Sequence, residues 1–403
     1  MLMIRTSVKR RILSAIGSAA AVVFVFASLA VVSHLFPQNI NVPESIPESS
    51  DLFTNIQIKN DAQAILYETT APAPEPVEPE IPKTPEIAET TAPPPAGKLM
   101  TVNKSDERED LSSFSTHSGK ISEQTFGRSD GGQFIDLAGG GQLRNCTGIS
   151  NEQVLYAASV PSDISVELYS DEPQVLIVHT HTTESYEPYE KDWYDESYTG
   201  RSYDPSNGVV AVGEAIAEKL AAAGITTVHD CMIHDSVYNG AYSRSLATTV
   251  DVIARYPSIK VVLDIHRDAI EYEDGTRVSA VTDIDGRKAA QCMIICAADD
   301  GTYGVPDFYE NLHFACELQS AMESGFPTLT RPVLFQYCQY NQQVSPGALL
   351  IEVGSHGNST EQAVYSGELI GEALASLLTK KAQPIEAVPV LASVPMYFLE
   401  MVR

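Results

Sequence analysis

The chain has 403 residues, 43% of them hydrophobic, which is enough for one or two domains with full-sized cores. Lys and Arg number 26 against 53 Asp and Glu, so the formal net charge is −27. This balance argues against nucleic acid as a partner, because a phosphate backbone requires a concentrated basic surface. It also argues against electrostatic adhesion to anionic lipid.

The N-terminal segment has the pattern of a membrane anchor. Residues 12–36 contain no Asp, Glu, Lys or Arg, and about 20 apolar residues are enough to cross a bilayer. Four basic residues precede this run and should stay in the cytoplasm, which places the chain from residue 37 onward outside it. A cleaved signal peptide is the alternative, since SLA at 28–30 loosely resembles a cleavage site. We expect residues 1–36 to be a cytoplasmic basic flank and one retained transmembrane helix in the cell membrane.

Residues 37–130 have the composition of a tether. Nine prolines lie between Pro72 and Pro95, and proline fixes φ and lacks an amide donor, so this part should be extended polyproline II. Ser, Thr and acidic residues follow without a periodic apolar face. We therefore expect a disordered extracytoplasmic spacer over 37–130.

Residues 131–381 alternate apolar strands with amphipathic helices. This alternation predicts an α/β layered domain with a largely parallel sheet and helices on both faces. Two Asp-Gly pairs, at 274–275 and 285–286, predict a hairpin excursion. Residues 382–403 form a C-terminal tail with no assigned role. The expected strands lie at 173–178, 225–228, 259–265, 289–297, 332–338 and 348–352, and the expected helices at 208–223, 243–255, 307–322 and 360–380.

The six cysteines do not form a recognisable framework. No CxxC pair occurs, which argues against a structural zinc site of that type. Cys292 and Cys296 would share a face of one strand at about 13 Å, too far apart for a disulfide. We expect buried free thiols.

Three polar clusters follow apolar strands, each at the strand's carboxyl end. They are HTHTTESY from His179, DIHRD from Asp264 and EVGSHGNS from Glu352. In open α/β sheets, ligands bind outside the carboxyl ends of the strands. The coincidence of three clusters therefore predicts one functional site.

The first two clusters carry metal-ligand spacing. His181 and Glu184 are three residues apart just past a strand end, and His266 would complete the two-His, one-Glu set of a hydrolytic zinc site. His179 competes with Glu184, because positions i and i+2 of a strand share a face. Zn²⁺ is thus the expected cofactor.

Two further residues are candidates for catalysis. Glu352, at the end of an apolar strand, is the natural general base for an attacking water. Arg267 could stabilise an oxyanion or hold a substrate carboxylate, with a salt bridge to Asp264 or Asp268 as the equal alternative.

The loop 186–203 holds five tyrosines and the single tryptophan, Trp193. Because it leaves the strand that carries the first cluster, it should overhang the site. Its aromatic rings could stack on a glycopeptide. A loop packed by its own aromatic side chains is the favoured alternative.

Several of these motifs, together with the anchor and tether, resemble the stage II sporulation protein P family. They occur in the order PQVLIVHTHTTESY, NGVVAVGEAIAEKLAAAGI, HDSVYNGAYSRS, VVLDIHRDA and LLIEVGSHGNSTEQA. The resemblance covers roughly residues 131–380. One departure is that His356 and Gly357 follow EVGS where an Asn-Thr pair is expected, which should alter the loop after Glu352 and not Glu352 itself.

The resemblance implies a peptidoglycan hydrolase of endospore-forming bacteria with a fold similar to zinc N-acetylmuramoyl-L-alanine amidases. The resemblance also implies that His181, Glu184 and His266 are zinc ligands and that Glu352 is the catalytic carboxylate. It also implies endopeptidase activity on peptide cross-links, and stage II sporulation proteins D and M as partners during engulfment. A zinc peptidase acting only on stem peptides and an inactive peptidoglycan-binding scaffold are the alternative functions.

Overall fold

The structure is a computed structural model that describes residues 96–382. The predicted anchor, most of the predicted tether and the C-terminal tail lie outside these residues. Between residues 96 and 382, every helix is too short or too polar to cross a bilayer.

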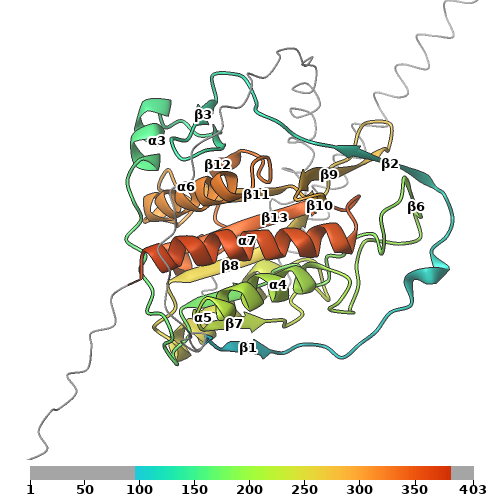
Figure 1. Cartoon of the computed structure of the whole chain (residues 1–403), viewed down its shortest axis with the longest axis horizontal. Helices are drawn as coiled ribbons and strands as arrows, with labels where there is room; N and C mark the ends of the chain where they lie inside the picture. Colours follow the sequence, from blue (N-terminus) through green and yellow to red (C-terminus); the bar gives the residue numbers. More distant parts are fainter. Residues whose placement is uncertain (1–95, 383–403) are drawn as a thin grey trace, which may run out of the picture. The chain divides into compact units, whose positions relative to one another are not determined.

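A mainly parallel sheet of nine strands forms the centre of the described region (Figure 1). Neighbouring strands are parallel except where β13 meets β11 and β4 meets β3. The predicted α/β class with a largely parallel sheet is confirmed, and β5, β8 and β13 are consecutive, so their carboxyl ends lie side by side. The strands, in order across the sheet, are β1 (Leu99–Val102), β7 (Thr227–Asp230), β5 (Val175–Val178), β8 (Val261–Asp268), β13 (Gly347–Ser355), β11 (Cys292–Ala298), β12 (Val333–Tyr337), β4 (Gln142–Asn145) and β3 (Phe134–Asp136).

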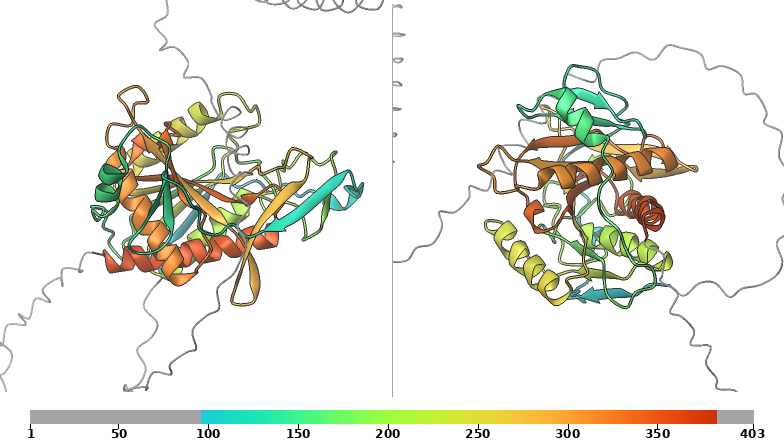
Figure 2. Two further views of the ribbon diagram at one scale, coloured as in Figure 1. Left: turned by 90° about the horizontal axis from the view of Figure 1, so that it is seen from above. Right: turned by 90° about the vertical axis from the view of Figure 1, so that its left-hand side faces the viewer.

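Helices flank the sheet on both faces (Figure 2). Side chains alternate along β5, so Val175 and Ile177 join the core beneath α4, α6 and α7. Leu176 and Val178 point the other way and pack with Val252 of α5. The helices are α3 (Asn151–Ala158), α4 (Val209–Ala222), α5 (Ala241–Arg255), α6 (Phe308–Gly325) and α7 (Thr360–Lys380), with short 3-10 helices η1 (Leu111–Ser113) and η2 (Gln342–Val344).

Local sequence signals account for the helix boundaries. After α4, Gly224 has a φ of 84°, a value that glycine adopts without strain. Ser359 precedes α7 and forms a capping box with Gln362, in which each side chain bonds the other residue's backbone amide. The helices predicted at 208–223 and 360–380 are found within one residue of those bounds.

A second sheet of four strands lies beside the first and contains the predicted hairpin. Its strands, in order, are β10 (Arg287–Ala290), β9 (Arg277–Ile284), β2 (Gly119–Gln124) and β6 (Trp193–Tyr194). Asp285 and Gly286 both have positive φ, at 53° and 76°, as the tight turn between β9 and β10 requires. Because β6 lies within the aromatic loop 186–203, this sheet helps to hold that loop.

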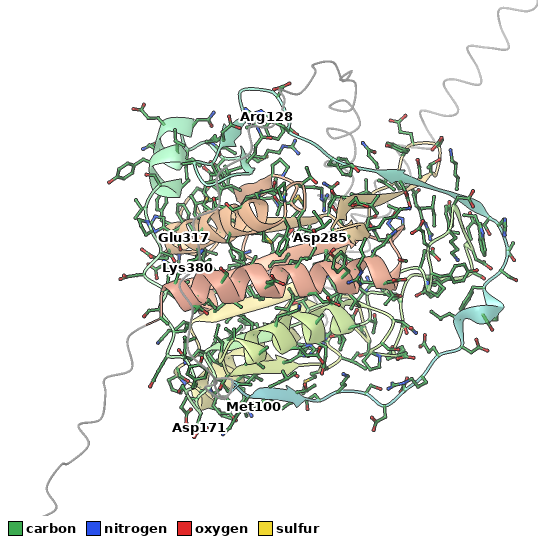
Figure 3. All side chains as sticks on the ribbon, in the orientation of Figure 1. Met100, Arg128, Asp171, Asp285, Glu317 and Lys380 are labelled. Carbon is green, nitrogen blue, oxygen red and sulfur yellow. The ribbon has the colours of Figure 1, made fainter. Side chains whose placement is uncertain are left out.

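Residues 96–130 belong to the fold, which corrects the predicted disordered tether over 37–130. β1 pairs with β7 at one edge of the large sheet, and β2 pairs with β9 in the small sheet. The segment runs around the molecule from Met100 at one edge to Arg128 near the other (Figure 3). We call residues 103–124 the strap. Its one strand, β2, is short and polar without apolar periodicity, and pairing with β9 and β6 orders it.

Cysteine burial agrees with the expectation for five positions. Cys231, Cys292, Cys296, Cys316 and Cys338 are buried free thiols, which confirms the sequence interpretation for them. The sixth cysteine, Cys146, is exposed instead.

Candidate active site

The three predicted polar clusters meet at the carboxyl ends of β5, β8 and β13. Glu352 lies opposite His266 in the parallel ladder of β13 and β8. Glu184 Oε2 is 3.6 Å from His266 Nδ1, and the rings of His181 and His266 are perpendicular with centroids 5.4 Å apart. The fold therefore brings four residues that are distant in sequence to one edge of the sheet, where open α/β sheets bind ligands.

His181 is buried without a hydrogen-bond partner. Neither ring nitrogen has one among residues 96–382, and Asp235 Oδ2, at 4.0 Å from Nδ1, is beyond hydrogen-bond distance. Burial lowers the pKa of His181, which favours the neutral imidazole that ligates metals. A buried polar group without a partner is costly, so these nitrogens point to a ligand.

His266 is flanked by two carboxylates. Its Nε2 is 2.9 Å from Asp264 Oδ1 in an ion pair that is not aligned as a hydrogen bond, and its Nδ1 faces Glu184. Asp264 is fixed in turn by the amide and hydroxyl of Thr180, at 2.8 and 2.6 Å. Burial alone would lower the pKa of His266, but Asp264 and Glu184 outweigh it and raise the pKa well above 6.5. A carboxylate behind a histidine in this way orients the ring of a metal ligand.

Glu184 occupies a tight loop against the start of α4. Its carbonyl accepts a hydrogen bond from Val209 N at 3.0 Å, and its Oε2 accepts one from Arg267 N at 3.1 Å. Burial would raise the pKa of Glu184, but His266 and His181 hold it well below 4.5. The carboxylate is therefore ionised, as a metal ligand must be.

His179 faces away from this cluster, into the core. Its Nδ1 is 3.0 Å from Ile265 O and its Nε2 is 3.0 Å from His229 Nε2. Burial lowers the pKa of His179 to about 3. With both ring nitrogens engaged, His179 does not compete with Glu184 for the place beside His266.

Glu352 is half-buried, and one of its two carboxyl oxygens is buried and unsatisfied. Its Oε2 has no hydrogen-bond partner in the described part of the chain. Burial raises the pKa of Glu352 to about 8, and the charge of Asp268 adds to the shift. A carboxylate with a pKa near neutrality has the property required of a general base.

The unusual loop after Glu352 does not disturb it. His356 Nε2 is 3.6 Å from Glu271 Oε2, and Ser355 Oγ is 3.2 Å from His356 Nδ1. Asn358 closes the loop, because its side-chain oxygen accepts hydrogen bonds from the amides of Ser355 and Ala280. His356 thus lies among loop contacts of its own, as the sequence interpretation expected.

Arg267 holds the aromatic loop instead of facing the site. Its Nε donates to Ser185 O at 2.9 Å, its Nη2 to Gly200 O at 3.1 Å and its Nη1 to Asp268 O at 3.2 Å. The predicted role in oxyanion or carboxylate binding has no support in these contacts, and the alternative salt bridge is replaced by bonds to carbonyl oxygens. Because these partners are all backbone atoms, no side-chain pattern could have revealed them.

Arg267→Lys is expected to lower the free energy of unfolding by about 2–4 kcal/mol, because one ammonium cannot reproduce three diverging donors. Urea denaturation followed by Trp193 fluorescence measures the change. Arg255→Lys is the matched control, since Arg255 makes an exposed ion pair on α5 and should change stability by less than about 1 kcal/mol. Equal stability of the two variants would contradict the conclusion that Arg267 holds the loop through its three hydrogen bonds.

The aromatic loop is packed mainly by its own side chains and by the strap. Tyr186, Tyr194 and Tyr198 are buried. From the strap, Phe114 packs on Tyr198 at 5.1 Å and His117 stacks on Trp193 at 3.8 Å between ring centroids. These ring contacts come from the strap, so the loop is not packed by its own aromatic side chains alone, and Tyr189 and Tyr203 are exposed.

Three tyrosines that the sequence analysis did not assign surround the two histidines. Tyr238 stacks on His181 at 4.7 Å, and Tyr242 lies 5.7 Å from the ring of His181 and 6.3 Å from that of His266. Tyr340, from the segment before η2, packs on Tyr242 at 5.3 Å. Tyr238 and Tyr242 belong to the motif HDSVYNGAYSRS, and this motif could have indicated that they lie near the site. The sequence around Tyr340 contains no comparable indication.

The donor set suits zinc. Among residues 96–382, no three His, Cys, Asp or Glu side chains stand in a ready-made metal-binding arrangement. The chemistry nevertheless fits, because two imidazoles and one ionised carboxylate converge and both ring nitrogens of His181 are unpartnered. Zinc binding is therefore a proposal that the residues present support.

Comparison with known proteins identifies the family. Residues 70–375 match the family described as stage II sporulation protein P (SpoIIP). The chain belongs to this family. It is 29% identical over 204 residues to stage II sporulation protein P of Bacillus subtilis (strain 168), with 48% of each chain covered, so it spans about half the length of that curated relative. The resemblance seen in the sequence is thus confirmed.

Solved structures similar to this SpoIIP-family chain include amidases. N-acetylmuramoyl-L-alanine amidase AmiC2 of Nostoc punctiforme is 13% identical with a TM-score of 0.30, covering 51% of this chain and 96% of that chain. The CwlD amidase from Clostridioides difficile, in complex with the GerS lipoprotein, is 13% identical with a TM-score of 0.32, covering 52% and 98%. These sequence identities and TM-scores are too low to support a function. The functional proposal therefore rests on membership of the family and on the residues of the site.

Proposed function

We propose that this protein is a membrane-anchored, zinc-dependent peptidoglycan hydrolase that cleaves the amide between the muramic acid lactyl group and L-alanine during engulfment. The observation that carries the proposal is the convergence of His181, Glu184 and His266 with Glu352 at adjacent strand ends. Membership of the SpoIIP family supports a role in sporulation.

His181, Glu184 and His266 would hold the zinc ion. When bound, zinc supplies Lewis acidity toward the amide carbonyl and toward water. Asp264 orients the ring of His266, and the loop contacts of Glu184 fix its carboxylate. These contacts preorganise the site before substrate arrives.

Glu352 moves the proton during hydrolysis. A bond forms between the water oxygen and the lactyl carbonyl carbon, and the bond from that carbon to the L-alanine nitrogen breaks. Glu352 takes a proton from the water and passes it to the nitrogen, which leaves as an amine. The lactyl carbon becomes a carboxylic acid, which then loses its proton to bulk water and ends as a carboxylate. Its raised pKa makes Glu352 a stronger base than an ordinary glutamate.

Peptidoglycan as substrate agrees with the surface chemistry. A glycan with short peptides needs stacking surfaces and not a basic patch, and the exposed Tyr189 and Tyr203 lie on the loop that leaves the site. The proposal includes the single N-terminal anchor in the cell membrane, an extracytoplasmic catalytic domain, and stage II sporulation proteins D and M as partners.

The deciding experiment is digestion of purified sacculi by the full chain, with mass analysis of the products. An amidase releases whole stem peptides and leaves free lactyl carboxylates on bare glycan. Shortened stem peptides would instead identify a zinc peptidase, and binding without release an inactive scaffold. Treatment with a chelator should stop release and added zinc should restore it, so chelator-insensitive cleavage would overturn the metal assignment.

A further inference from the structure

The site as described lacks a donor for the oxygen of the scissile carbonyl. Arg267, the candidate from sequence, has its three donor nitrogens engaged by backbone carbonyls. Hydrolysis of an amide places negative charge on that oxygen as water adds, and hydrogen-bond donors aimed at it are a large contribution to catalysis. A hydrogen-bond donor that faces the substrate would add to the Lewis acidity that the proposed zinc supplies.

Tyr242 lies where such a donor is needed. Its ring is nearly parallel to that of His266, with an interplanar angle of 12°, and nearly perpendicular to that of His181. It comes from the first turn of α5, and its backbone carbonyl accepts hydrogen bonds from Asn341 Nδ2 at 3.0 Å and Ser245 Oγ at 3.1 Å. The backbone of Tyr242 is thus fixed, and its ring lies beside the two histidine rings.

The hydroxyl of the half-buried Tyr242 differs from those of the buried tyrosines. Tyr186, Tyr194 and Tyr365 each donate to a backbone carbonyl, at 2.9 to 3.0 Å. Within residues 96–382, the hydroxyl of Tyr242 has no such partner. Tyr242 is half-buried, so a substrate can reach its side chain, and an ordinary phenol keeps its proton at neutral pH. A hydroxyl left unsatisfied beside the two histidines is therefore available to a substrate.

We infer that the Tyr242 hydroxyl donates a hydrogen bond to the carbonyl oxygen of the scissile amide, and that this bond strengthens as water adds to the carbonyl carbon. Tyr242 transfers no proton in this step and returns unchanged. The inference rests on the proposed hydrolase function. Tyr340, whose ring contacts Tyr242, supports its position from the other side.

Tyr242→Phe tests the inference with the full chain. We expect kcat for stem-peptide release to fall by about 10²-fold, the effect of removing one oxyanion donor, with KM changed by less than about threefold. Affinity for a phosphinate analogue of the muramoyl–L-alanine amide should fall by the same factor, whereas affinity for the released stem peptide should not change. Zinc content and Tm should stay constant, because the hydroxyl bonds no described protein atom.

Tyr156→Phe is the control, because Tyr156 is 74% exposed on the distant helix α3. A kcat for Tyr242→Phe within threefold of wild type would overturn the inference. Loss of zinc from Tyr242→Phe, with activity restored by added zinc, would also overturn the inference. In that case the phenol would only position a histidine that binds zinc. Failure of the proposed function is distinct from both outcomes, because the wild-type chain would then release nothing.

Discussion

Glu352→Gln is expected to lower the rate of stem-peptide release by about 10²–10⁴-fold, the range for removal of a general base. The amide has the same shape as the carboxyl group but cannot accept the proton from water. Release is measured on purified sacculi with full-length protein, alongside zinc content and thermal unfolding.

The stability of this variant separates a catalytic role from a structural one. Burial disfavours the carboxylate of Glu352, whose Oε2 has no hydrogen-bond partner within residues 96–382. A neutral amide should be easier to bury, so Tm is expected to stay the same or rise while activity is lost. Zinc should remain bound, because Glu352 is not one of the proposed ligands.

Glu372→Gln is the matched control, since the Glu372 side chain on α7 is 60% exposed and distant from the strand ends. It should retain wild-type release. Wild-type activity of Glu352→Gln would remove Glu352 from the mechanism, and a large fall in its Tm would identify a structural group.

Gly208→Ala is expected to lower the free energy of unfolding by about 1–3 kcal/mol, as forced overpacking does, and to weaken zinc binding. A Cβ on Gly208 would lie 2.1 Å from the carbonyl oxygen of Glu184, a backbone atom that cannot rotate away. Backbone strain is not involved, because the φ of Gly208 is −143°. The loop that carries Glu184 must therefore move.

Urea denaturation and zinc retention during dialysis against a competing chelator measure the two effects. Gly325→Ala is the control, because a Cβ there meets no atom within 4 Å and Ala is the better helix former. It should keep wild-type zinc affinity. If Gly208→Ala also bound zinc normally, the contact with Glu184 would not determine the position of that ligand.

The elements predicted best from the sequence are those specified by local chemistry. α7 could be predicted because its apolar face repeats along the helix and a capping box marks its start. β5, β8 and β13 are short apolar runs followed by polar clusters, and parallel sheets align such carboxyl ends. The meeting of His181, Glu184, His266 and Glu352 could therefore be anticipated before any coordinates.

The contacts that the sequence did not reveal depend on residues far apart in the chain. The strap is polar, and its strand β2 pairs with β6 and with β9, which is more than 150 residues away. Arg267 bonds backbone carbonyls, and every residue type supplies those. Strand alternation left His179 as a competitor of Glu184, whereas in the structure both ring nitrogens of His179 face Ile265 and His229.

Composition and local pattern by themselves determined the fold class and the set of chemical groups at the strand ends, because these follow from periodicity and residue type. The family was indicated by the resemblance of five motifs in order. Tertiary structure decided which groups face one another. It placed Tyr242 beside two histidines, directed the Arg267 guanidinium to backbone carbonyls and paired parts of residues 96–130 with the sheets. Such choices depend on non-local packing and on backbone hydrogen bonds, which have no signature in the order of side chains.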